Sequence, residues 1–157
     1  MAKIQFKAGS EYMKKLETLE RSFRHEIAGK AIYNGAAIVA AAIQAGISGL
    51  RTTDGEQLGK LSAKQRYGLH QSLGIAKLQD DAGQLNVKIG WDGYNDVKTK
   101  RWPKGQPNQM IARSVERGTS FMPATPFVKQ AVSKSRKAAL DAMGDTVEQE
   151  IQKIMKG

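Results

Sequence analysis

Few side chains in this 157-residue sequence have the types and spacing that catalysis or metal binding requires. The chain has no cysteine, which excludes disulfides and thiolate metal sites. The two histidines, His25 and His70, have no nucleophile or metal-ligand partner at a recognised spacing. Asp80 and Asp81 are adjacent carboxylates, but a turn before a strand explains them without catalysis. Nothing here assembles a nucleophile, a base and oxyanion donors.

Residues 55–60, Gly-Glu-Gln-Leu-Gly-Lys, come nearest to a phosphate-binding loop. The motif needs four residues between its glycines and a Ser or Thr after its lysine. Here only three residues separate Gly55 from Gly59, and Leu61 follows Lys60. No clear strand precedes the segment either. We therefore predict that the protein is not an enzyme and uses no cofactor.

Positive charge is concentrated in one part of the chain. The formal net charge is +10, and residues 97–140 hold ten Lys or Arg side chains but a single acid, Glu116, so this span carries +9 of the total. Such a cluster favours an anionic partner, either nucleic acid or an acidic protein surface. The alternative is a solvated face that keeps a small protein soluble.

Trp102 lies inside this basic span, among Lys98, Lys100, Arg101 and Lys104. One interpretation is nucleic-acid binding, with a base stacked on the indole and the cations holding phosphate. The other is a protein interface, because Trp and Arg are common interface anchors. We favour the interface. Residues 95–109 show no apolar periodicity, so we expect an excursion that is mobile until a neighbouring subunit orders it.

Two stretches of helical periodicity precede the basic span. Ser10 and Glu11 indicate a helix start, and apolar residues then recur at steps of three and four as far as Gly46. Either one long helix bends near Gly29 or two helices meet there. The part after Gly29 is rich in Ala and Gly, and we expect it to pack closely against another helix.

The middle of the chain changes character twice. Residues 48–60 are polar and glycine-rich and predict a loop, and residues 62–71 predict a short helix. Apolar residues alternate in 73–79 and 85–91, on either side of the turn residues 80–83. This pattern predicts a β-hairpin with one buried face.

The stretch 110–128 leads into the last helix. Pro126 suits the first turn of a helix, and Thr125 before it is expected to accept hydrogen bonds from the first-turn amides. Gly118 is expected to adopt a conformation that other residues resist. Phe121, Met122 and Phe127 are expected to hold the turn against a core. The helix continues to the end of the chain, with an expected break at residues 144–145.

These elements predict one α+β domain spanning residues 1–157: a small, mostly antiparallel sheet packed against long N-terminal and C-terminal helices. A content of 40% hydrophobic and 25% charged residues suits a folded, soluble chain. Residues 1–7 show no apolar core of signal-peptide length. The longest apolar run, 35–43, is short of the roughly 20 residues that a membrane span needs, so we expect no membrane contact.

Residues 116–127 read Glu-Arg-Gly-Thr-Ser-Phe-Met-Pro-Ala-Thr-Pro-Phe. This segment resembles the motif Glu-Phe-Gly-Thr-x-x-Met-Pro-Ala-x-Pro-Phe of the tail-component family of long-tailed, double-stranded DNA phages, the neck or tail-completion proteins. The matching residues are Glu116, Gly118, Thr119, Met122, Pro123, Ala124, Pro126 and Phe127, and Arg117 stands where an aromatic is usual.

Other segments resemble the same family in the same order. Residues 69–73 are similar to its Leu-x-x-Ser-Ile segment, and residues 87–90 to its second strand. Residues 53–55 only approximate its Asp-Thr-Gly loop, and they lie further from Ser72 than usual. The excursion at 95–109 is longer than the family norm.

The resemblance implies a structural virion protein at the phage head–tail junction. It implies a neck or tail-completion subunit that is made in the bacterial cytoplasm and forms a homo-oligomeric ring, a hexamer or a dodecamer. The implied neighbours are head-closure or connector proteins on one side and tail-tube or tail-terminator proteins on the other, with nonspecific DNA contact allowed. The alternative that the charge favours is a small basic nucleic-acid-binding protein.

Overall fold

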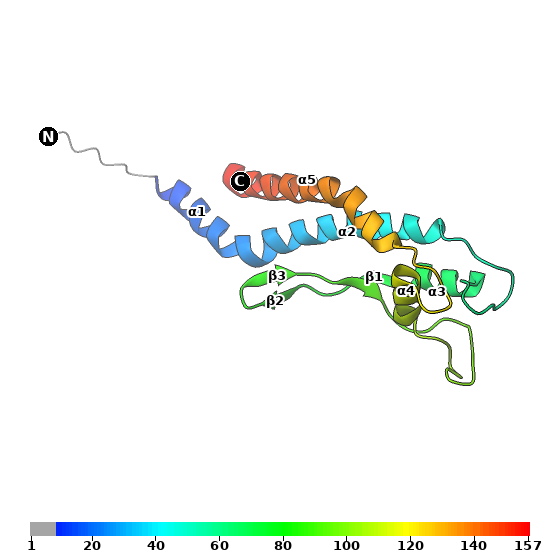
Figure 1. Ribbon diagram of the computed structural model, residues 1–157. Helices are drawn as coiled ribbons and strands as arrows, with labels where there is room; N and C mark the ends of the chain where they lie inside the picture. The colour runs from blue at the N-terminus through cyan, green and yellow to red at the C-terminus, as the bar shows by residue number, and fades with distance from the viewer. Residues whose placement is uncertain (1–8) are drawn as a thin grey trace.

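Two long helices run side by side along the molecule, and the β-hairpin lies on the other side of the N-terminal one (Figure 1). The structure is a computed structural model and describes residues 9–157, so the stretch 1–7 considered above lies outside the described residues. The elements are α1 (Ser10–Ser22), η1 (Phe23–Ile27), α2 (Ala28–Ser48), α3 (Ala63–Ser72), β1 (Leu73–Ile75), β2 (Gln79–Asp81), β3 (Gln84–Asn86), β4 (Ile89–Trp91), α4 (Asn108–Arg117) and α5 (Phe127–Lys156).

The N-terminal helices form one continuous helix from Ser10 to Ser48. The five residues of η1 form a π-helical turn between α1 and α2. The helix changes direction in this region (Figure 1), and an inserted π turn is a known cause of such bends. Gly29 serves another purpose: a Cβ there would lie 2.9 Å from Leu78 Cδ2, so the glycine lets the hairpin approach the helix.

The close packing expected of the Ala- and Gly-rich helix is confirmed where α2 meets α5. A Cβ on Gly35 would lie 2.7 Å from Met143 Cγ and 3.4 Å from the Ala139 carbonyl oxygen. Beside this contact, Asn34 Nδ2 donates a hydrogen bond to Thr146 Oγ1 at 2.9 Å. The absence of a side chain at Gly35 is therefore what allows the two helix backbones to approach.

The predicted hairpin is present, and its ladder is interrupted. β1 pairs antiparallel with β4, and β2 pairs antiparallel with β3. Its two-residue turn has positive φ at Ala82 (53°) and Gly83 (90°), as a type I′ hairpin turn requires. Between the two ladders, the Leu78 amide donates to the Tyr33 hydroxyl at 2.7 Å. Three residues, 76–78, stand opposite two, 87–88, so the register shifts by one residue there and the strands are shorter than 73–79 and 85–91.

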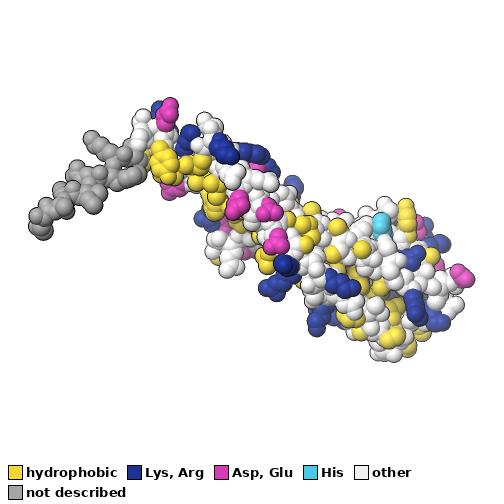
Figure 2. Space-filling view, turned by 90° about the horizontal axis from the view of Figure 1, so that it is seen from above, with side chains coloured by type: hydrophobic (Ala, Val, Ile, Leu, Met, Phe, Trp, Pro, Cys, Tyr) yellow, Lys and Arg dark blue, Asp and Glu magenta, His cyan; other side chains and the backbone are white. Residues whose placement is uncertain are grey.

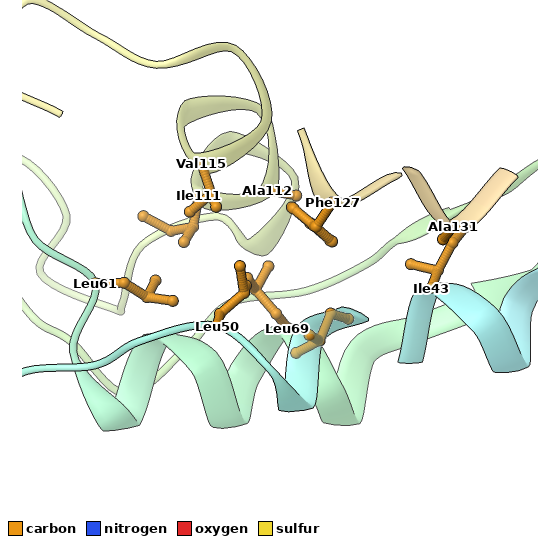
Figure 3. Close-up of a cluster of buried hydrophobic side chains, with 10 residues drawn as sticks. Ile43, Leu50, Leu61, Leu69, Ile111, Ala112, Val115, Phe127 and Ala131 are labelled. Atoms are coloured by element: carbon orange, nitrogen blue, oxygen red, sulfur yellow. The ribbon is translucent and has the colours of Figure 1, made fainter. Parts of the chain in front are cut away.

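The hydrophobic core lies at one end of the molecule, where the end of α2, α3, α4 and the start of α5 meet (Figure 3). Ile47 and Leu69 are fully buried there. Trp91 and Phe127 meet edge to face with ring centroids 5.9 Å apart, which brings the hairpin into the same core. At the other end, α1 contains no buried residue. The α+β architecture expected from the sequence is thus observed, with its core displaced to one end.

Two expectations about the C-terminal half are wrong. Residues 108–117 form the helix α4, where the sequence analysis assigned no helix. Gly144 does not break the last helix, and α5 continues to Lys156. A glycine inside a helix costs only about 1 kcal/mol relative to alanine. Met143 against Gly35 and the buried Thr146 hold the helix together on either side of it.

The helix Ser10–Ser48 is long and apolar enough, by length and composition alone, to cross a membrane. Its most apolar 18-residue window has a mean hydropathy of 1.4. That window lies in a helix that packs along α5 and against the hairpin, so packing accounts for part of its apolar surface. The absence of membrane contact stays a prediction.

Candidate functional site

The residues of the 116–127 motif form a corner between α4 and α5. α4 ends at Arg117 and is followed by Gly118, whose φ is 75°. A Cβ there would lie 2.8 Å from the Ala124 amide nitrogen and 2.9 Å from the Met122 carbonyl oxygen, so only glycine fits without strain. Thr119 closes the turn: its hydroxyl accepts from the amides of Phe121 at 3.2 Å and Met122 at 3.1 Å.

Glu116 joins the two helices across this corner. Its carboxylate accepts hydrogen bonds from two first-turn amides of α5, from Val128 at 2.8 Å and from Lys129 at 3.0 Å. These amides have no partner within the helix, and a negative charge is favourable at a helix N-terminus. The last turn of α4 therefore caps the first turn of α5.

The expected cap at Thr125 is wrong because Glu116 occupies the amides that it would bind. The Thr125 side chain makes no capping bond, and its amide donates to the Val115 carbonyl at 2.7 Å instead. Pro126 sits at the N-cap position, one residue before the first turn to which the sequence assigned it. The helix α5 therefore starts at Phe127, with Pro126 as its N-cap residue.

The apolar residues of the corner divide between core and solvent. Phe127 is buried against Trp91, and Met122 packs partly buried against the core, as expected. Phe121 is 67% exposed, so the expectation that it holds the turn against the core is wrong. Pro123 and Ala124 are also exposed. The corner therefore presents Phe121 and its neighbours as a surface.

The basic segment forms a loop closed at its base by Asn95. The Asn95 amide donates to the Gln106 carbonyl at 2.9 Å. Its side-chain oxygen accepts from the amides of Val97 at 2.9 Å and Gln106 at 3.3 Å. Gly105 has a φ of 112°, and a Cβ there would lie 2.0 Å from the Asn95 carbonyl oxygen. Val97 is buried, so this excursion has packing of its own, which its lack of apolar periodicity did not predict.

The tip of this loop displays its cations around the indole. The Trp102 amide donates to Thr99 at 3.0 Å, which folds the tip back on itself. The Arg101 guanidinium lies 5.6 Å from the centre of the Trp102 ring, within cation–π range. The cationic side chains are exposed, and within residues 9–157 none of them forms an ion pair; they are Lys98, Lys100, Arg101 and Lys104. The five predicted interface residues thus lie together on one loop.

All ten bases of the span 97–140 are exposed, and they lie on the loop, on α4 and on the first half of α5. Elsewhere on the molecule, acidic and basic side chains are interspersed, and the face drawn in Figure 2 shows both signs of charge along its length. The span 97–140 is therefore a local excess of positive charge.

An open groove between α2 and α5 was not predicted from the sequence. It has a volume of about 910 Å³. Small and apolar residues of α2 and α5 line it: Ala28, Ala31, Ile32, Leu140, Met143, Gly144 and Val147. Three acids of α5 flank them: Asp141, Asp145 and Glu148. The acids recur at steps of four and three, which places them on one face of α5. The spacing of these three acids was the feature of the sequence that could have indicated an acidic face on α5.

The remaining chemical candidates have structural roles. Asp80 forms an ion pair with Arg24 at 3.0 Å and accepts from the Gly83 amide at 2.8 Å. Asp80 and Asp81 lie at the end of β2, so the predicted turn is present but comprises residues 82–83 and not 80–83. In the loop 55–60, a Cβ on Gly59 would lie 2.1 Å from the Phe121 carbonyl oxygen, so this glycine permits loop packing. Among residues 9–157, no group of three or more His, Cys, Asp or Glu side chains is placed to hold a metal ion.

No family model, curated protein or solved structure matches this chain. The arrangement itself supplies two surfaces suited to macromolecular contact: the basic loop and the acid-flanked groove.

Proposed function

We propose that the protein is a structural subunit of a phage virion at the head–tail junction, acting as a neck or tail-completion ring protein. The observation that carries the proposal is the corner at residues 116–127. It resembles the phage motif in sequence, and its residues join two helices through the Glu116 cap, the Gly118 turn and the buried Phe127.

The division of surfaces supports an assembly role. The main cluster of buried side chains lies at one end, and the cationic loop and the groove remain open to solvent. A subunit that works by packing against copies and neighbours needs such open surfaces, since its function lies in contacts rather than in an enclosed site. The expected partners remain other copies of the chain and the connector and tail proteins on either side.

Native mass spectrometry and negative-stain electron microscopy of the purified protein test this function. We expect a closed ring of six or twelve copies, with mass spectrometry of purified virions detecting the protein in the particle. A chain that stays monomeric over the accessible concentration range and is missing from virions contradicts the proposal.

A second candidate function is nucleic-acid binding, favoured by the position of Arg101 over the Trp102 ring, among loop cations that form no ion pair within residues 9–157. Fluorescence anisotropy with duplex and single-stranded DNA at several salt concentrations tests it. Affinity that falls steeply with salt and ignores sequence reports only phosphate neutralisation. Tight single-strand binding that Trp102→Ala abolishes would favour this second function.

A further inference from the structure

The groove between α2 and α5 has the properties of a receptor for an apolar, cationic segment. Leu140 is 56% exposed on its edge. Gly144 adds open space, because a Cβ there would meet nothing within 4 Å. Around these residues, positions 138–149 contain three acids and no base. Within residues 9–157, Asp141, Asp145 and Glu148 form no ion pair.

The basic loop has the complementary properties. Residues 98–104 contain four cations and no acid, with one half-buried indole among them. A tryptophan side chain presents roughly 150–250 Å² of largely apolar surface, which an apolar groove can desolvate. The surrounding cations would meet the acids that flank such a groove, and complementary charge of this kind sets orientation and speeds encounter.

The loop cannot reach the groove of its own chain. The groove centres near Gly144, which lies 17 residues along α5 from its start at Phe127, a distance of roughly 25 Å. The loop leaves the other end of the molecule, beyond α4, and its base is fixed there by Asn95 (Figure 1). A contact between the two surfaces must therefore join two copies.

We propose that residues 98–104 of one subunit dock into the α2–α5 groove of a neighbouring copy, with Trp102 against Leu140 and with Arg101 and its neighbouring lysines facing Asp141, Asp145 and Glu148. The two surfaces differ, so the contact is heterologous: each subunit gives a loop to one neighbour and a groove to the other. Such a contact generates a ring when its rotation closes. The inference rests on the proposed function and names the contact that would build the ring.

Two variants, each defective in one surface, test this contact. The loop variant carries Arg101→Ser with Trp102→Ala, and the groove variant carries Leu140→Lys with Asp145→Lys. The control carries Lys77→Ser with Asp54→Lys, since both residues are exposed and lie outside both surfaces. Circular dichroism and urea unfolding check that every variant is folded. Light scattering after size exclusion and native mass spectrometry then give the size of each assembly.

We expect the wild type and the control to assemble, and each defective variant alone to stay monomeric. An equimolar mixture of the two variants should stop at a heterodimer, because only one intact loop and one intact groove remain to meet. If either variant alone forms the wild-type assembly, or if the mixture grows beyond a dimer, this contact is wrong although ring formation stands. A monomeric wild type overturns both the contact and the proposed function.

Discussion

The carboxylate of Glu116 accepts a hydrogen bond from the Val128 amide at 2.8 Å, across the nine residues, 118–126, that connect α4 and α5. It is a helix cap supplied by the preceding helix, and it fixes the angle at which α5 leaves the core. Because Lys129 shares the same carboxylate at 3.0 Å, one side chain satisfies two first-turn amides.

Removing this cap should destabilise the protein. We expect Glu116→Ala to lower the free energy of unfolding by about 1 kcal/mol, the usual cost of a lost N-terminal cap, with Glu116→Gln losing less because it keeps an acceptor. Urea unfolding measures both. Thr125→Ala is the matched control and should be nearly neutral, since its side chain makes no capping bond. Equal losses at Thr125 and Glu116 would show that the cap is assigned to the wrong residue.

Two glycines should respond to alanine with opposite signs. Gly118→Ala forces a side chain into a positive φ and against the Ala124 amide, and we expect a loss of about 1–3 kcal/mol. Gly144→Ala meets nothing within 4 Å in the middle of a helix, and we expect a gain of about 0.5–1 kcal/mol. Thermal and urea melts give both values. The Gly144→Ala measurement is made in the background of the loop variant, whose groove no neighbour fills, and a loss of stability there would contradict the open space beside Gly144.

The α2–α5 contact predicts an energetic coupling between Gly35 and Met143. Gly35→Val places a side chain where Met143 now lies, and we expect a loss of about 1–3 kcal/mol from overpacking. In a Met143→Ala background the same substitution should cost less, because the space is vacant. A double-mutant cycle in urea measures the difference. Strictly additive losses would contradict the close approach of the two helices.

Ion pairs with Lys30 and Lys153 hold the pKa of Glu150 below the usual range of a glutamate. A carboxyl whose pKa is lowered by folding adds stability above its unfolded-state pKa, about 4.3, and loses that contribution as the pH falls through its lower folded-state value. The stability gap between the wild type and Glu150→Gln should therefore be largest near neutral pH and close in acid. Glu148→Gln serves as the control, because Glu148 forms no ion pair within residues 9–157. A gap that widens on acidification would contradict this assignment.

The sequence predicted those elements whose signals are local. Helical spacing located α2, α3 and α5, and the turn residues located the hairpin. The cap of α5 was missed because the acceptor, Glu116, lies 12 positions before Val128, outside the stretch next to the helix in which a cap is normally sought. The exposure of Phe121 was missed because the apolar character of a residue in a turn does not show whether its side chain points to the core or to solvent. α4 was missed because it follows directly on a segment with no apolar periodicity.

The candidate surfaces show the same division between local and distant signals. The basic loop was predicted because its four cations and Trp102 are adjacent in the chain. The groove was not predicted, since it exists only where Ala31 of α2 meets Leu140 and Met143 of α5. The acids of the groove are regularly spaced in the sequence. The α2 residues that line the groove beside them lie more than a hundred positions earlier in the chain.

Because the main buried cluster lies at one end, the two ends of the molecule should unfold locally at different free energies. The segments that pack around Ile47 and Leu69 should exchange their amide hydrogens only on global unfolding, whereas α1, with no buried residue, should exchange by local opening at far lower free energy. Hydrogen exchange would then show a gradient of protection along the helix Ser10–Ser48 instead of a single cooperative block. A chain with such a gradient can rearrange its N-terminal end while the opposite end stays folded.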